Sequence, residues 1–107
     1  MTATEFRRMA LSMPEAVEAA HMGHPDFRVG GKIFATLGYP NAACAALMLT
    51  PEQQELFVRT ESKTFRPVPG GWGAQGATQI VLRTAKKSAV REALQVAWSN
   101  RAPRRKQ

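Results

Sequence analysis

The sequence predicts a small α+β domain in which helices cover one face of a single antiparallel sheet. A chain of 107 residues with 44% hydrophobic residues can bury one core but not two. Two apolar runs are joined by Gly30-Gly31, a pair that permits the tight turn of a β-hairpin. Segments with helical spacing lie near the start, the middle and the end of the chain. We therefore expect the order α-β-β-β-β-α-β-β-α.

A helix is predicted at the start of the chain. Thr2 and Glu5 have the spacing of a capping box, in which each side chain satisfies a free backbone amide of the other residue. Pro14 cannot continue a helix, so we expect the helix to end near Ser12. A short strand over residues 17–22 follows. The apolar stripe of the helix consists of Phe6, Met9, Ala10 and Met13.

The central feature is a β-hairpin within residues 24–37. A two-residue turn predicts that Val29 pairs with Lys32 and that Phe27 pairs with Phe34. The pleat of the strands then assigns alternate residues to opposite faces. One face receives Phe27, Val29, Lys32, Phe34 and Thr36, and the other receives Arg28, Ile33, Ala35 and Leu37. Both faces are then partly apolar, so either helices cover one face and something else contacts the other, or the register differs by one residue.

The remaining elements follow from caps and strand breakers. Thr50, Pro51 and Gln53 make the clearest helix start in the chain, with a threonine cap and a proline at the first helical position. We expect in order a strand over 44–49, a helix over 50–60, an edge segment over 65–69, a flexible loop over 70–76, a strand over 78–83 and a helix over 85–100. The edge segment contains two prolines, which cannot donate to a sheet ladder.

The positive charge is concentrated at one end of the chain. The formal net charge is +7, and residues 83–107 alone account for all of it. We predict one domain over residues 1–100, followed by a basic, disordered tail over residues 101–107, which has no apolar anchor. Any attraction for polyanions should therefore be strongest at this end.

Several classes of protein do not fit the sequence. No apolar run reaches the 18 residues of a membrane span, and the N-terminus lacks the pattern of a signal peptide. The single cysteine, Cys44, has no partner for an internal disulfide. We expect a cytoplasmic monomer that does not engage a membrane.

The residues that carry chemistry are sparse. His21 and His24 are too few for a zinc site, and Cys44 lies in an apolar strand run where its thiol is expected to be inert. Asp26 is the only aspartate, so no pair of carboxylates is evident. We therefore predict that the protein is not an enzyme and uses neither a metal nor another cofactor.

Three segments resemble the MmcQ/YjbR family. The resemblance is carried by the hairpin residues His24, Pro25, Phe27, Arg28, Val29, Gly30, Gly31, Lys32, Phe34 and Ala35, by Phe65-Arg-Pro-Val-Pro-Gly-Gly-Trp-Gly73 with Gly76, and by Leu-Ser-Met-Pro-Glu15. Members usually place a tryptophan where this chain has Ala77. The resemblance implies a fold similar to frataxin and DNA binding through a double wing of hairpins. Iron chemistry is not implied, because Glu5 is the only acidic residue of the first helix.

Our first hypothesis is a protein that binds duplex DNA, mainly through backbone phosphates. Rigid hairpins would act as wings, and the last helix and the tail would add attraction. The candidate nucleic-acid-binding residues are Arg28, Lys32, Arg66, Lys86, Lys87, Arg91, Arg104, Arg105 and Lys106. A broad basic face shared by the hairpin and the last helix would favour this hypothesis.

The alternative is a non-catalytic module that binds an anionic small ligand or an unidentified protein. Its site would combine the exposed face of the sheet with the loop that carries Trp72. The candidate residues are His24, Phe27, Arg28, Lys32, Arg66 and Trp72. A pocket lined by Trp72, Arg28 and Lys32 would favour this alternative.

Overall fold

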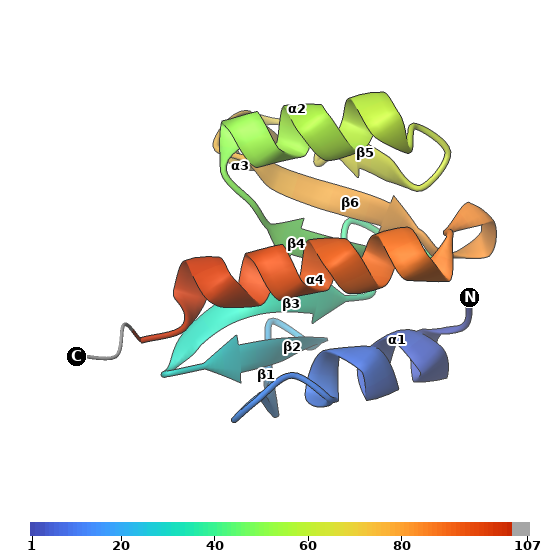
Figure 1. The fold of residues 1–107 in the computed structure, drawn as a ribbon. Coiled ribbons are helices and arrows are strands. Elements are labelled where there is room, and N and C mark those ends of the chain that lie inside the picture. Colours follow the sequence, from blue (N-terminus) through green and yellow to red (C-terminus); the bar gives the residue numbers. More distant parts are fainter. Residues whose placement is uncertain (104–107) are drawn as a thin grey trace.

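The computed structural model describes residues 1–103, which form a six-stranded antiparallel sheet and the helices around it (Figure 1). The strands are β1 (Val17–His21), β2 (His24–Val29), β3 (Lys32–Leu37), β4 (Cys44–Met48), β5 (Phe65–Pro67) and β6 (Ala77–Val81), in the spatial order β1-β2-β3-β4-β6-β5. The helices are α1 (Ala3–Leu11), α2 (Pro51–Thr60), α3 (Gly71–Ala74) and α4 (Lys87–Arg101), with a short 3₁₀ turn, η1 (Leu82–Thr84), before α4. The predicted α+β class is confirmed.

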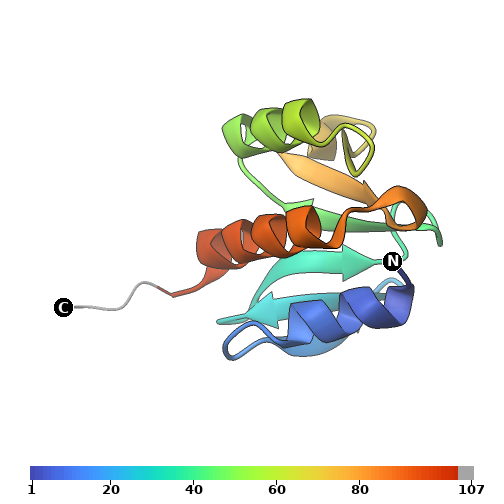
Figure 2. The same ribbon diagram turned by 45° about the vertical axis from the view of Figure 1, so that its right-hand side comes forward.

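The helices α1, α2 and α4 lie on one face of the sheet, which we call the covered face (Figures 1 and 2). The main core lies between these helices and the strands. Its largest fully buried side chains include Phe6 of α1, Phe27 of β2 and Leu94 of α4. The opposite face, which we call the outer face, carries a smaller apolar cluster formed by Ala46, Met48, Val68 and Ala77.

Both predicted capping boxes are present. In α1 the amide of Glu5 donates to the Thr2 hydroxyl at 3.1 Å, and in α2 the amide of Gln53 donates to the Thr50 hydroxyl at 3.2 Å. Each cap satisfies backbone groups that a helix terminus leaves free. No helix of the described residues is long and apolar enough to cross a membrane.

The predicted register of the central hairpin holds for its first two pairs and is wrong beyond them. Val29 pairs with Lys32 as expected, but Phe27 pairs with Ala35 because the register shifts between Phe27 and Arg28. A β-bulge of this kind adds one residue to a strand and changes the face of every residue beyond it. Thr36, predicted on the face of Phe27, instead pairs with Asp26.

Residues 70–76 form structure where a flexible loop was predicted. α3 begins at Gly71, and a Cβ at Gly73 would lie 1.6 Å from the backbone oxygen of Val68. The glycine therefore allows a backbone contact that no other residue permits. The next strand, β6, ends at Val81 rather than at residue 83.

Residues 101–103 are folded where a disordered tail was predicted. α4 extends to Arg101, Ala102 packs against the main core, and Pro103 contacts the hairpin turn at Gly30. The three cations predicted for the tail, Arg104, Arg105 and Lys106, lie outside the described residues. The contact between Pro103 and Gly30 brings the end of α4 beside the central hairpin.

Candidate functional site

One row of paired residues crosses the outer face from β2 to β5. In order across the sheet it contains Asp26, Thr36, Ala46, Gln79 and Arg66. Residues that are directly paired in an antiparallel sheet share a face, so this row locates polar side chains on the side away from the three long helices. The outer face is therefore the candidate location of a functional site.

A groove of about 400 Å³ lies on this face. Its volume falls within the range of about 300–1,000 Å³ that is typical of small-molecule sites. The lining residues come from β1, from the β2–β3 hairpin and its turn, from β4, from α3 and from the end of α4. They are His21, Arg28, Gly31, Lys32, Ile33, Thr36, Met48, Trp72 and Arg101.

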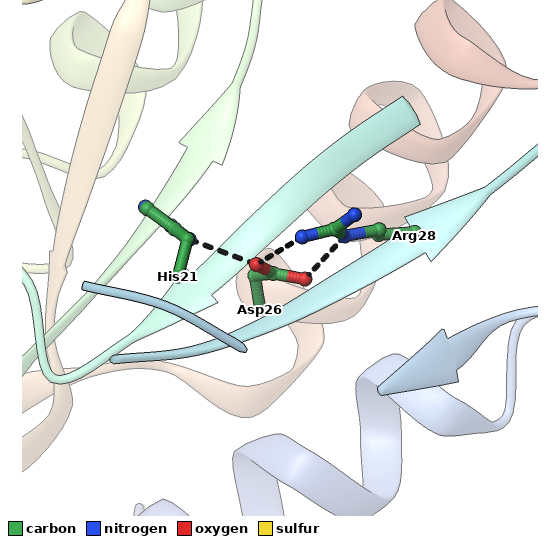
Figure 3. Close-up of polar contacts among 3 residues, drawn as sticks. All are labelled: His21, Asp26 and Arg28. Atoms are coloured by element: carbon green, nitrogen blue, oxygen red, sulfur yellow. Dashed lines mark hydrogen bonds and ion pairs between the residues drawn. The ribbon is translucent and has the colours of Figure 1, made fainter. Parts of the chain in front are cut away.

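A buried carboxylate holds one wall of the groove in place (Figure 3). Arg28 donates to Asp26 from Nε at 2.8 Å and from Nη2 at 3.0 Å, and His21 Nδ1 lies 2.8 Å from the same carboxylate. The hydrogen bonds from Arg28 lower the pKa of Asp26, and His21 adds to the effect, against the opposing effect of burial. Asp26 is therefore an internal anion that fixes the orientation of Arg28.

Two further cations line the groove without a carboxylate partner. Within residues 1–103, neither Lys32 nor Arg101 forms an ion pair. Lys32 follows the hairpin turn, and Arg101 reaches the groove because Pro103 packs on that turn. Since Asp26 already compensates Arg28, these two residues give the groove its excess positive charge.

An aromatic side chain forms part of the groove lining. Trp72 of α3 packs against Tyr39 with ring centroids 5.2 Å apart and an interplanar angle of 65°, and 36% of Trp72 is exposed. Tyr39 in turn contacts His24 at 6.1 Å between centroids. The groove therefore combines a partly exposed indole with cationic side chains.

The structure brings together only part of the set predicted for the alternative site. Arg28, Lys32 and Trp72 line one groove, as that hypothesis requires. Arg66 shares the outer face but lies on the edge strand β5, away from the groove lining. His24 contacts Tyr39 and does not line the groove. The role predicted for Phe27 is wrong, because this ring is fully buried against Phe6 in the main core.

The cations at the start of α4 lie in a different place. Lys86 pairs with Glu61 at 3.7 Å, and Lys87 pairs with Glu5 of α1. The hydrogen bond from Lys87, helped by the backbone amide of Thr2, lowers the pKa of Glu5 to about 2. Arg91 lines a second hollow, of about 320 Å³, between α1 and α4.

The predicted nucleic-acid-binding residues that the structure describes therefore form two groups. Arg28 and Arg66 belong to the outer face and Lys32, beside the hairpin turn, lines the same groove, whereas the cations of α4 lie on the helix that packs on the covered face. Lys87 and Arg91 lie in the first two turns of α4, and Arg101 ends it. The helix thus contributes to two separate surfaces.

Six lining residues were absent from the predicted site: His21, Gly31, Ile33, Thr36, Met48 and Arg101. His21 had been considered only as a metal ligand, and Arg101 had been assigned to the tail. Thr36 had been placed on the other face, because the bulge that moves it leaves no mark in the apolar pattern. Thr36 is 1% exposed, and its hydroxyl has no hydrogen-bond partner among the described residues.

Other reactive groups of the described chain offer no second site. Burial raises the pKa of the Cys44 thiol, which is the opposite of what a nucleophilic cysteine requires. Among residues 1–103, no three His, Cys, Asp or Glu side chains are grouped so that they could hold a metal ion. The chemistry of the groove is that of cations, an indole and a hydroxyl.

Comparison with known proteins assigns the chain to a family. The YjbR family model matches residues 11–100, a segment that contains every groove residue except Arg101. Comparison with curated proteins gave no match. The match agrees with the resemblance noted in the hairpin and in the segment around Trp72. The chain belongs to the YjbR family.

Proposed function

We propose that the protein is a non-catalytic, cytoplasmic binding module that takes a phosphate-bearing ligand in the groove of the outer face. The observation that carries the proposal is the convergence of Arg28, Lys32 and Arg101 on one groove with a single carboxylate, Asp26, behind them. Guanidinium and ammonium groups are the side chains that bind phosphate most strongly.

The arrangement of Arg28 supports binding rather than a purely structural role. Asp26 takes two of its donors, and the side chain of Arg28 is still 32% exposed. A guanidinium held by a buried carboxylate loses little freedom when an anion arrives, so less of the binding energy is spent on ordering it. Lys32 and Arg101 supply the net charge that attracts the anion.

A charge-matched pair of variants on α4 tests the proposal. Arg101→Gln removes a cation from the groove, whereas Arg91→Gln removes one from the hollow between α1 and α4. We expect calorimetric titration with inorganic pyrophosphate at low salt to show at least tenfold weaker binding for Arg101→Gln, because a hydrogen bond to a charged group contributes about 1.5–3 kcal/mol. Arg91→Gln should bind within twofold of the wild type. Equal losses in the two variants, or no binding by the wild type, would contradict the proposal.

Duplex DNA is a second candidate ligand, favoured by one observation. Arg66 lies on the same face as Arg28, and Arg101 joins them from the last helix, so cations extend from β2 to β5. Such a surface would bind phosphates without reading bases, and its affinity would fall steeply between low and moderate salt.

Removal of residues 104–107 tests the DNA candidate without touching the described domain. We expect the truncated chain to bind every duplex sequence more weakly by a similar factor and to show a shallower salt dependence, because fewer phosphates are neutralised. Arg66→Gln should weaken duplex binding but not pyrophosphate binding. Full affinity for duplex DNA after both changes would exclude this candidate.

A further inference from the structure

We infer that the ligand of the groove is a nucleotide: its phosphate is held by the cations and its base lies against Trp72. This inference rests on the proposed function and adds the chemical class of the ligand. Phosphate binding alone explains the cations of the groove but leaves its remaining lining unexplained. That remaining lining is an indole, two apolar side chains, a buried hydroxyl, the imidazole of His21 and the turn glycine Gly31.

The groove has two chemically different walls. The cationic wall is built on the hairpin of β2 and β3, which carries Arg28 and Lys32. The opposite wall is built by Met48 of β4 and Trp72 of α3, which packs beside β6. In the strand order β2-β3-β4-β6, the first wall lies at β2 and β3 and the second begins at the next strand, β4. Arg101 lies near both walls, because it also lines a neighbouring hollow with Met48, and Pro103 beyond it contacts Gly30. A ligand that spans the groove therefore meets Lys32 and Arg101 with its anionic group and Trp72 with a flat apolar group.

Trp72 is placed to receive a flat ring. Its contact with Tyr39 at an interplanar angle of 65° fixes the indole from one side, and 36% of the residue remains exposed. Large aromatic side chains are usually more deeply covered unless a partner covers them. Stacking on an indole depends little on which base is bound, since every base has a π-face.

Thr36 lies between the two walls, on the central strand of the groove. Its hydroxyl is almost fully buried and has no partner among residues 1–103, whereas the buried hydroxyl of Thr78 donates to the oxygen of Gly76 at 2.8 Å. A buried hydroxyl without a partner costs stability, so its retention requires an explanation. A sugar hydroxyl or a base edge in the groove would supply the missing partner.

The test compares three ligands by calorimetric titration of the full chain at fixed salt. The probes are adenosine monophosphate, ribose 5-phosphate and inorganic pyrophosphate. We expect adenosine monophosphate to bind about tenfold more tightly than ribose 5-phosphate, which has the same phosphate and sugar but no base. Trp72→Leu should remove this difference, and Trp72→Phe should restore part of it.

Thr36→Val separates a binding role from a structural one. Valine has the shape of threonine and lacks the hydroxyl, so the free protein should melt at the same or a higher temperature while adenosine monophosphate binds several-fold more weakly. Thr78→Val is the matched control: it breaks an existing hydrogen bond, so it should lower the melting temperature and leave binding unchanged.

The outcomes separate the nucleotide assignment from the proposed phosphate binding. Equal affinities for adenosine monophosphate and ribose 5-phosphate would overturn the nucleotide assignment and leave phosphate binding intact. Failure of all three probes to bind would overturn the proposed function as well. A lower melting temperature for Thr36→Val with unchanged nucleotide affinity would show that the hydroxyl serves the fold, which also contradicts the inference.

Discussion

At the scale of single residues, Asp26 shows how one buried charge can organise a surface. Its carboxylate is inaccessible to solvent, and three hydrogen-bond distances of 2.8–3.0 Å connect it to Arg28 and His21. A buried charge is tolerated only when it is paired in this way. The pairing also explains why Arg28, two residues further along β2, is held beside the groove.

The pH dependence of stability tests the role of Asp26. Its pKa in the folded protein is below the ordinary value of 3.8, so the carboxylate stabilises the fold above about pH 4 and loses that contribution as the pH falls further. We expect Asp26→Asn to reduce the free energy of unfolding at pH 7 by about 1–3 kcal/mol, because buried hydrogen bonds to a charged group are lost. Its urea midpoint should then vary less than that of the wild type between pH 4 and pH 2.

Glu18→Gln provides the control for this change. Glu18 lies on the neighbouring strand and pairs with Arg7 at 2.9 Å, but both side chains are about one-third exposed or more. A pair so accessible to solvent contributes about 0–1 kcal/mol. Equal effects of Asp26→Asn and Glu18→Gln at pH 7 would contradict the account of the buried carboxylate.

At the scale of elements, the β2–β3 turn connects the fold to the groove. Gly30 and Gly31 both have positive φ, at +58° and +78°, as the sequence motif predicted. They differ in their surroundings. A Cβ at Gly30 would lie 2.7 Å from Pro103, whereas a Cβ at Gly31 would meet nothing within 4 Å.

This difference allows the contact with Pro103 to be measured. Gly31→Ala should reduce the free energy of unfolding by about 1 kcal/mol, the cost of a left-handed backbone with a side chain. Gly30→Ala should cost more, because the added methyl group also displaces Pro103 and, with it, the end of α4 that carries Arg101. Denaturant unfolding of the two variants measures the difference. Equal costs would show that the contact with Pro103 contributes nothing to stability.

Features of the fold that depend on contacts between nearby residues could be predicted from the sequence, whereas the position of the β-bulge could not. Local rules predicted both capping boxes and the glycine turn, because those contacts join residues two or three positions apart. Apolar residues on both faces of the hairpin left open a register error of one residue, but they could not show where the bulge in β3 lies. That single error moved Thr36 to the wrong face, and the site prediction omitted it.

At the scale of the whole molecule, the folded chain divides its positive charge between two surfaces. Arg28, Lys32 and Arg101 meet at the outer groove, while Lys87 and Arg91 lie at the start of α4, where Glu5 compensates Lys87. The sequence located the excess charge at one end of the chain, but it could not show that α4 carries it to two places. That division depends on the docking of α4 and on the contact of Pro103 with the hairpin.

The two tryptophans allow the most direct measurement of the central claim, that phosphate binds in the outer groove. The indole of Trp72 lies in the groove, whereas the Nε1 of Trp98 donates to the backbone oxygen of Pro14 at 2.9 Å. In a titration with pyrophosphate followed by ¹H–¹⁵N spectra, the account predicts shifts in the indole signal of Trp72 and in the amides of Lys32 and Thr36, with the Trp98 signal unmoved. Shifts confined to Lys87 and Arg91, or no shifts at all, would contradict it.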